Sequence, residues 1–123
     1  MLQNRRTIGE RGEAAAIRFL EKKGYRILDK NYRCKSGEID IVARDKDNIA
    51  FVEVKTRTSI EFGLPEESLS WRKKVHLTKV ALNYLSHRKI KGASCRFDVV
   101  SVLMKGEDNQ SIHLIKDAFP SAF

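Results

Sequence analysis

Cysteine and long apolar stretches are scarce in this chain of 123 residues. The two cysteines, Cys34 and Cys95, stand far apart and form no C-x-x-C pair, which argues against a zinc ribbon and against a disulfide scaffold. No stretch is long and apolar enough to cross a bilayer, and the first segment, MLQNRRTIGERGE, becomes charged before an apolar run can form. We therefore expect a reduced, cytoplasmic protein that is neither secreted nor membrane-spanning.

Acidic residues are also in deficit. Lys and Arg number 24 against 16 Asp and Glu, giving a formal charge of +8 and an isoelectric point of about 9.7. This bias favours a polyanionic partner, with nucleic acid the first candidate and an acidic membrane surface the second. Many small proteins are basic, so charge alone is weak support. The length and the 41% hydrophobic content fit a single domain over residues 1–123, without repeats, low-complexity tracts or linkers.

Hydrophobic spacing and turn residues predict the order helix, three strands, helix, two strands. The first helix ends at Gly24, and the Asp- and Asn-rich stretch after Ala43 joins two strands as an antiparallel hairpin. Pro65, followed by two acidic residues, Glu66 and Glu67, predicts the start of the second helix. The predicted elements span residues 8–23, 25–31, 38–43, 49–56, 65–87, 94–104 and 111–116.

Charged residues interrupt the two strands of the predicted hairpin, GEIDIVARD and FVEVKTR. Strict alternation of side chains places Glu38, Asp40 and Val42 on one face of the first strand and the residues between them on the other. In the second strand the same rule puts Glu53 and Lys55 on a common face. If the hairpin aligns the two charged faces, Asp40, Glu53 and Lys55 converge on one small volume.

Two carboxylates that are buried together repel each other unless a cation compensates, and oxygen ligands favour Mg²⁺ or Mn²⁺. Such an ion would bind oxygens of Asp40 and Glu53, the Val54 carbonyl and water. Lys55 would then hold a phosphate oxygen, or orient or deprotonate the attacking water, which is the equipment for hydrolysing a phosphodiester. The alternative is a solvated strand face with ordinary cross-strand ion pairs, and the E-x-K triplet alone does not decide between the two.

A carboxylate on the first helix points inward. Glu13 precedes Ile17 by four positions and Leu20 by seven, so it lies on the apolar side of the helix. A contact to a metal-bound water or to Lys55 would explain this position, and a helix-edge pair with a nearby arginine would explain it equally well. Glu10, one turn earlier, is a weaker candidate because an acid near a helix N-terminus is favourable by itself.

A lysine on the second helix has a similar position. Lys73 stands four residues after Leu69 and four before Leu77, in the stripe that should face the sheet. Its ammonium group would contact the carboxylate cluster or a substrate phosphate, or else its long stem would carry it to the helix edge. Arg72 and Lys74 beside it are expected to form a solvated rim that attracts phosphate.

Eight features in this order form a specific pattern: GERGE, NYR, GEIDIVARD, FVEVKTR, the Phe62-Gly63 pair, the Lys73 helix, RFDVV and IKDAF. Across nearly the whole chain they resemble the YraN-type family of uncharacterised bacterial proteins. That family resembles the restriction-endonuclease-like PD-(D/E)xK nucleases and, among them, the archaeal Holliday-junction resolvases. The resemblance implies an α/β fold with an α-β-β-β-α-β core, in which helices flank a mixed central sheet.

The same resemblance implies roles for individual residues. Asp40 matches the first acid of the motif, Glu53 and Lys55 match its E-x-K, and Glu13 matches the first-helix acid of the resolvase-like branch. Ile39 stands where the motif has its proline. The pattern as a whole predicts a nuclease site, although a fold resemblance does not establish a function.

The leading hypothesis is a metal-dependent DNA endonuclease, using Mg²⁺ or Mn²⁺ and acting on branched or otherwise structured DNA. Asp40 and Glu53 would ligate the metal with Val54, Lys55 would activate water, and Glu13 and Lys73 would support them. A homodimer is expected only by analogy with resolvases. The alternatives are a non-catalytic nucleic-acid-binding module that retains the nuclease fold, and a structural or protein-binding domain. The predicted phosphate-binding residues are Arg57, Arg72, Lys74, Arg88 and Lys89.

Overall fold

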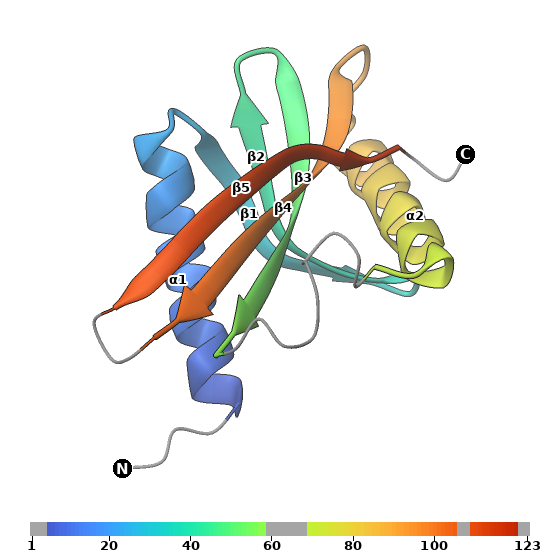
Figure 1. Cartoon of the computed structure of the whole chain (residues 1–123). Helices are drawn as coiled ribbons and strands as arrows, with labels where there is room; N and C mark the ends of the chain where they lie inside the picture. The colour runs from blue at the N-terminus through green and yellow to red at the C-terminus, as the bar shows by residue number, and fades with distance from the viewer. Residues whose placement is uncertain (1–4, 59–68, 106–108, 121–123) are drawn as a thin grey trace.

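The computed structural model describes residues 5–58, 69–105 and 109–120 (Figure 1). Its two helices and five strands follow the predicted order and confirm the α/β class with an α-β-β-β-α-β core. None of the described helices is long and apolar enough to cross a membrane. The elements are α1 (Arg5–Lys22), β1 (Arg26–Cys34), β2 (Gly37–Asp45), β3 (Asn48–Arg57), α2 (Trp71–His87), β4 (Ser94–Met104) and β5 (Gln110–Phe119).

The five strands form one mixed sheet in the order β1-β2-β3-β4-β5. Only β3 and β4 run parallel, and α2 lies in the crossover between them, as a parallel connection requires. The two helices lie on opposite sides of the sheet (Figure 1). Phe51 packs in the core beneath α2, whereas its neighbours Ala50 and Val52 pack beneath α1. The centre of the sheet is therefore buried on both faces.

The second helix begins later than the sequence predicts. Ser70 is its N-cap, with an extended backbone and a side-chain Oγ that accepts the backbone N–H of Lys73 at 3.1 Å. The assignment of Leu69 to the helical stripe is wrong, because Leu69 precedes the cap and is buried in the core beneath α2. The predicted start at Pro65, with Glu66 and Glu67 in the first turn, lies outside the described residues.

The predicted alternation along β2 is also wrong. Ile39 and Val42 both pack beneath α2, whereas Ile41 packs beneath α1, so the alternation breaks between Ile39 and Ile41. On the neighbouring strand, Asn31 has a φ of 53°, a left-handed conformation that interrupts a regular strand. The pairs Lys30–Ile41 and Tyr32–Ile39 flank this point, so Asn31 lies opposite Asp40.

The outer strands are longer than predicted. The first strand continues to Cys34 instead of ending at residue 31, because it stays paired with β2 as far as Cys34–Gly37, and Arg33 also forms an ion pair with its cross-strand partner Glu38 at 2.7 Å. The last strand reaches Phe119, whose ring stacks on Phe97 with centroids 4.8 Å apart. Both extensions depend on contacts with neighbouring strands, which local residue preference does not reveal.

A buried charged network fixes the hairpin end of the sheet. The Arg96 guanidinium donates to Asp98 at 3.0 Å, to Asp45 at 2.7 Å and to the Tyr25 hydroxyl at 2.7 Å. Asp98 is fully buried, and Lys116 adds a second ion pair to Asp45 at 3.3 Å. These contacts join the segment after α1 to β2, β4 and β5. The network therefore stabilises the frame that holds the other end of the hairpin.

Candidate active site

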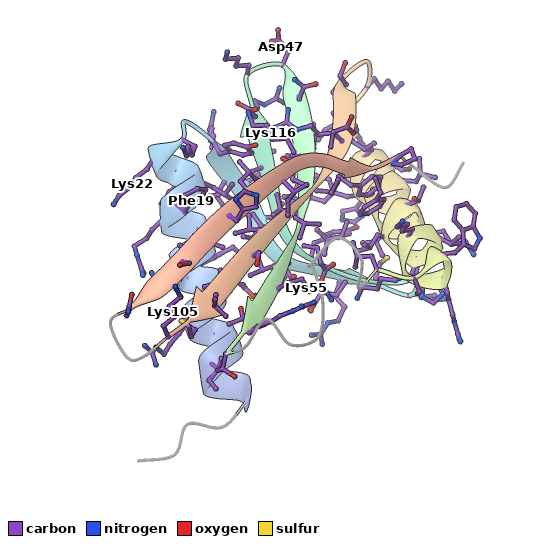
Figure 2. The ribbon with its side chains drawn as sticks, in the orientation of Figure 1. Phe19, Lys22, Asp47, Lys55, Lys105 and Lys116 are labelled. Carbon is purple, nitrogen blue, oxygen red and sulfur yellow. The ribbon has the colours of Figure 1, made fainter. Side chains whose placement is uncertain are left out.

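A cleft of about 870 Å³ opens between α1 and the first three strands. Lys55 belongs to it and lies well away from Asp47 at the tip of the β2–β3 hairpin (Figure 2). Acidic and basic side chains both line this cleft. Its lining residues are Gly9, Glu10, Glu13, Ala14, Ile17, Lys30, Asn31, Arg33, Glu38, Asp40, Val54, Lys55 and Thr56.

Asp40 lies where β2 separates from β3. The pairing of the two strands runs from Asp45–Asn48 to Ile41–Val52, so Asp40 is the first residue beyond it. Its Oδ2 accepts the backbone N–H of Val54 at 2.8 Å, which replaces the backbone acceptor that a regular ladder would provide. This bond fixes the carboxylate in the opening between the strands and toward the cleft.

Glu53 is the most strongly perturbed acid of the site. Burial, followed by the charge of Asp40, raises its pKa from 4.5 to about 8. Its Oε2 is buried and has no hydrogen-bond partner among the described residues. A buried oxygen of this kind is costly unless a proton or a cation satisfies it. Glu53 and Asp40 therefore form a close acidic pair whose negative charges repel each other.

The two predicted lysines both act on this pair. The positive charges of Lys73 and Lys55 lower the pKa of Glu53 and so oppose the rise in this pKa that burial causes. Lys55 lines the cleft, whereas Lys73 approaches from the first turn of α2 with an exposed side chain. The structure thus brings Asp40, Glu53 and Lys55 together, with Lys73 nearby on the other helix.

Glu13 faces the same cleft from α1. Its Oε1 accepts a hydrogen bond from Asn31 Nδ2 at 2.9 Å. Burial raises the pKa of Glu13, the Asn31 hydrogen bond opposes this rise, and the charges of Asp40 and Glu38 add to it. The predicted inward direction of Glu13 is confirmed, but its observed partner is an amide instead of an arginine.

The residues fit a hard divalent cation. In the described part of the chain, no three side chains of His, Cys, Asp or Glu are grouped as a metal site. Mg²⁺, however, commonly uses one or two carboxylates and keeps several waters. Asp40 and Glu53 supply that number, and the unpartnered Oε2 of Glu53 gives a cation a specific place. The Val54 carbonyl stays a predicted third ligand.

The predicted phosphate-binding residues lie in three places, and Arg57, Lys74 and Arg88 among them already interact with other groups of the protein. Lys74 lies over the Phe119 ring at 5.5 Å. Arg88 forms an ion pair with Asp29 at 3.2 Å and lies over the Tyr84 ring, so it fastens α2 to β1. Binding of phosphate by the set stays a prediction. Arg57 is the last residue of β3, and Arg72 and Lys74 lie in the first turn of α2. Arg88 and Lys89 follow the last residue of α2, and the two ends of this helix are roughly 25 Å apart.

Sequence reasoning missed several cleft residues. Lys30, Asn31 and Arg33 come from β1, which offers no apolar alternation that would mark a functional strand. The one available signal was the motif NYR, which contains Asn31 and Arg33. Asn is the ordinary residue that most readily adopts a left-handed backbone.

Removing the charge of Glu53 is expected to stabilise the metal-free protein at high pH. Between pH 4.5 and about 8 the folded state keeps a proton that the unfolded chain has lost, so the free energy of unfolding falls as the pH rises through this window. Glu53→Gln, which cannot ionise, should exceed the wild type by roughly 2–4 kcal/mol at about pH 9 and differ little at about pH 5. Urea unfolding with a chelator measures this, and equal stabilities at the higher pH would contradict it.

Similar proteins come from several bacteria. The sequence matches the uncharacterised protein family UPF0102 over residues 12–102. A UPF0102 protein of Syntrophus aciditrophicus is 50% identical over 123 residues, covering 100% of this chain and 95% of the relative. One from Moorella thermoacetica is 48% identical over 97% of this chain and 100% of the relative. A third, from Geobacter metallireducens, is 42% identical over 100% of both chains.

Proposed function

The chain belongs to the uncharacterised protein family UPF0102. From the geometry of its cleft, we propose that it is a nuclease that depends on a divalent metal ion. It would hydrolyse phosphodiester bonds in DNA, including branched DNA. One observation carries the proposal. The buried, unpartnered Oε2 of Glu53 lies beside Asp40, and Lys55 is next to both. Asp40 and Lys55 line the cleft, and the partly buried Glu53 interacts with both, so a cation held by the two acids would meet an anionic phosphodiester that enters the cleft.

Each side chain has a distinct task in this reaction. Asp40 and Glu53 would hold Mg²⁺ or Mn²⁺, which supplies Lewis acidity to the phosphodiester and to the attacking water. Asp40 is kept in place by the Val54 N–H, so its carboxylate needs little reorganisation. As an ammonium ion, Lys55 would orient the attacking water and stabilise the negative charge that develops on phosphate; in its neutral form it would instead take the proton of that water.

The charge distribution supports a nucleic-acid substrate. The net charge of +8 attracts polyanions and lowers the cost of bringing phosphate near two carboxylates. Lys73 adds a cation on the side of α2 that reaches Glu53. Contacts of this kind recognise the backbone and not the bases, so binding should weaken steeply with salt and depend little on sequence.

Cleavage of end-labelled DNA tests the proposal. The substrates are single-stranded, duplex, flap and four-way-junction DNA, each incubated with Mg²⁺, Mn²⁺ or a chelator. We expect metal-dependent cutting by the wild type, reduced at least about 100-fold in Asp40→Asn, because the variant loses a charged ligand. Ser86→Ala, an exposed change at the far end of α2, serves as the matched control and should cut normally.

Two results would reject the nuclease function. If the wild type binds these DNAs in a salt-dependent way but cuts none, the chain is a nucleic-acid-binding module that retains a nuclease fold. If Asp40→Asn cuts as fast as the wild type from an identical preparation, the activity comes from a contaminant. Thermal unfolding of both variants shows whether any loss follows from misfolding.

A further inference from the structure

Asn31 has a left-handed backbone conformation in the middle of a strand. Its φ of 53° lies in a region that costs most residues with a side chain roughly 1–2 kcal/mol and that Asn adopts more readily than the others. The residue lies opposite Asp40, between the paired residues on either side. Strained conformations persist where the surrounding structure holds them, and they are frequent at functional sites. The position of Asn31 beside Asp40 therefore calls for a function.

The conformation directs the Asn31 side chain into the cleft. Lys30 and Asn31 both line the cleft, although consecutive residues of a regular strand point to opposite faces. The amide of Asn31 then reaches across to α1, where Nδ2 donates to Glu13 Oε1 at 2.9 Å. Without this donor, repulsion from Asp40 and Glu38 would favour turning the Glu13 carboxylate toward water.

The backbone beside Glu13 is held just as closely. A Cβ added to Gly12 would lie 2.0 Å from Oγ1 of Thr56, so α1 touches β3 at this point with no space for a side chain. The close approach fixes the Glu13 Cα relative to β3, and Asn31 fixes the end of the side chain. Two independent contacts thus define where the Glu13 carboxylate lies.

We propose that Asn31 is a positioning residue, which holds the Glu13 carboxylate in the cleft so that it contacts the hydration shell of the divalent cation bound by Asp40 and Glu53. This rests on the proposed function for the presence of the cation. Asn31 itself touches neither the ion nor the substrate and acts only through Glu13. Residues that hydrogen-bond to the ligands of a metal ion, without touching the ion, commonly contribute about 10–100-fold to metal affinity.

Mn²⁺ binding by the intact chain, measured by electron paramagnetic resonance without nucleic acid, tests this. Asn31→Gly keeps access to the left-handed backbone but removes the amide, and it should weaken Mn²⁺ binding about 10-fold. Glu13→Ala should weaken it by a similar factor. The double variant should bind no more weakly than Glu13→Ala alone, because Asn31 has no effect once its partner is gone.

The matched control is Lys46→Gly, at a second left-handed residue, with φ 56°, in the hairpin turn far from the cleft. It should bind Mn²⁺ like the wild type, which separates the lost amide from any general effect of glycine. Thermal unfolding confirms that each variant is folded.

Three results overturn the role of Asn31: a wild type that binds no Mn²⁺, an Asn31→Gly variant that binds as tightly as the wild type, or a loss that adds to that of Glu13→Ala. The cleavage assay is independent of all three. A chain that shows the expected coupling in Mn²⁺ binding but cuts no DNA keeps the role of Asn31 and loses the nuclease function.

Discussion

Replacing Lys55 with methionine is expected to lower the rate of DNA cleavage by about 10²–10⁴-fold while leaving DNA affinity and thermal stability nearly unchanged. The factor is that of a lost acid–base group in a reaction of this class. Methionine keeps most of the apolar stem, and Lys55 is only partly buried, so little packing is lost. Single-turnover cleavage, with binding measured separately in a chelator, checks both parts.

Lys55 could instead act only by lowering the pKa of Glu53, and the same variant separates the two roles. Loss of this cation raises the pKa of Glu53 further, which would weaken metal binding near neutral pH. In that case, higher pH or a higher Mg²⁺ concentration would restore the cleavage rate. A direct role in activating water predicts that neither condition restores it.

Lys30→Met is the matched control for Lys55→Met. Lys30 lines the same cleft from β1, carries the same charge and undergoes the same chemical change. The lysines that act on Glu53 are Lys73 and Lys55, whereas Lys30 acts on Glu13, so its loss should reduce cleavage less than about 10-fold and act mainly through DNA affinity. Equal losses in the two variants would mean that the cleft needs positive charge in general and not an amine at residue 55.

Much of the fold could be predicted because its signals are local. The strand over residues 94–104 was predicted with the observed bounds, since a long apolar run in a β-rich stretch has few alternatives. The hairpin around Asp47 was predicted from turn residues. Glu13 was correctly placed inward from its helical phase alone. In each case the residues that decide the structure lie within one turn or one strand.

The remaining features depend on residues that are distant in the sequence. The change of face between Ile39 and Ile41 accompanies the left-handed backbone of Asn31 on another strand, and a single sequence does not show which Asn will adopt it. Asp98 is an acid in an otherwise apolar strand, and the hydrogen bond that it accepts from Tyr25 spans 73 positions. Periodicity finds elements and faces, whereas cross-strand partners follow only from the register.

Arg96→Met is expected to destabilise the protein by roughly 3–5 kcal/mol, the usual cost of removing one partner of a buried ion pair. The guanidinium bonds three groups at once, and one of them, Asp98, has no exposed surface. Without Arg96 the Asp98 carboxylate keeps bonds from Tyr25 and from the Asp117 N–H but loses its counter-charge. This loss is a large fraction of the roughly 5–15 kcal/mol that holds such a domain together.

Urea unfolding at neutral pH measures the effect, and Arg44→Met is its control. Arg44 has the same charge in β2 but makes no ion pair with a described residue, so its loss should cost less than about 1 kcal/mol. Adding Asp98→Asn to Arg96→Met should recover part of the stability, because the uncompensated charge is gone and a side-chain oxygen remains for the Asp117 N–H. If the double variant is less stable than Arg96→Met, the destabilisation comes from lost packing and not from a buried charge.

Acid unfolding gives a second, independent readout of the same network. The hydrogen bond from Arg96 holds the pKa of Asp45 below its ordinary value of 3.8. In the wild type, Asp45 therefore contributes stability that is fully present above pH 3.8 and is lost as the pH falls through the lower pKa of the folded protein. Arg96→Met should lose most of this contribution at neutral pH, so its stability should fall less steeply with acid than that of the wild type. An unchanged slope would mean that Lys116, and not Arg96, is the cation that stabilises Asp45.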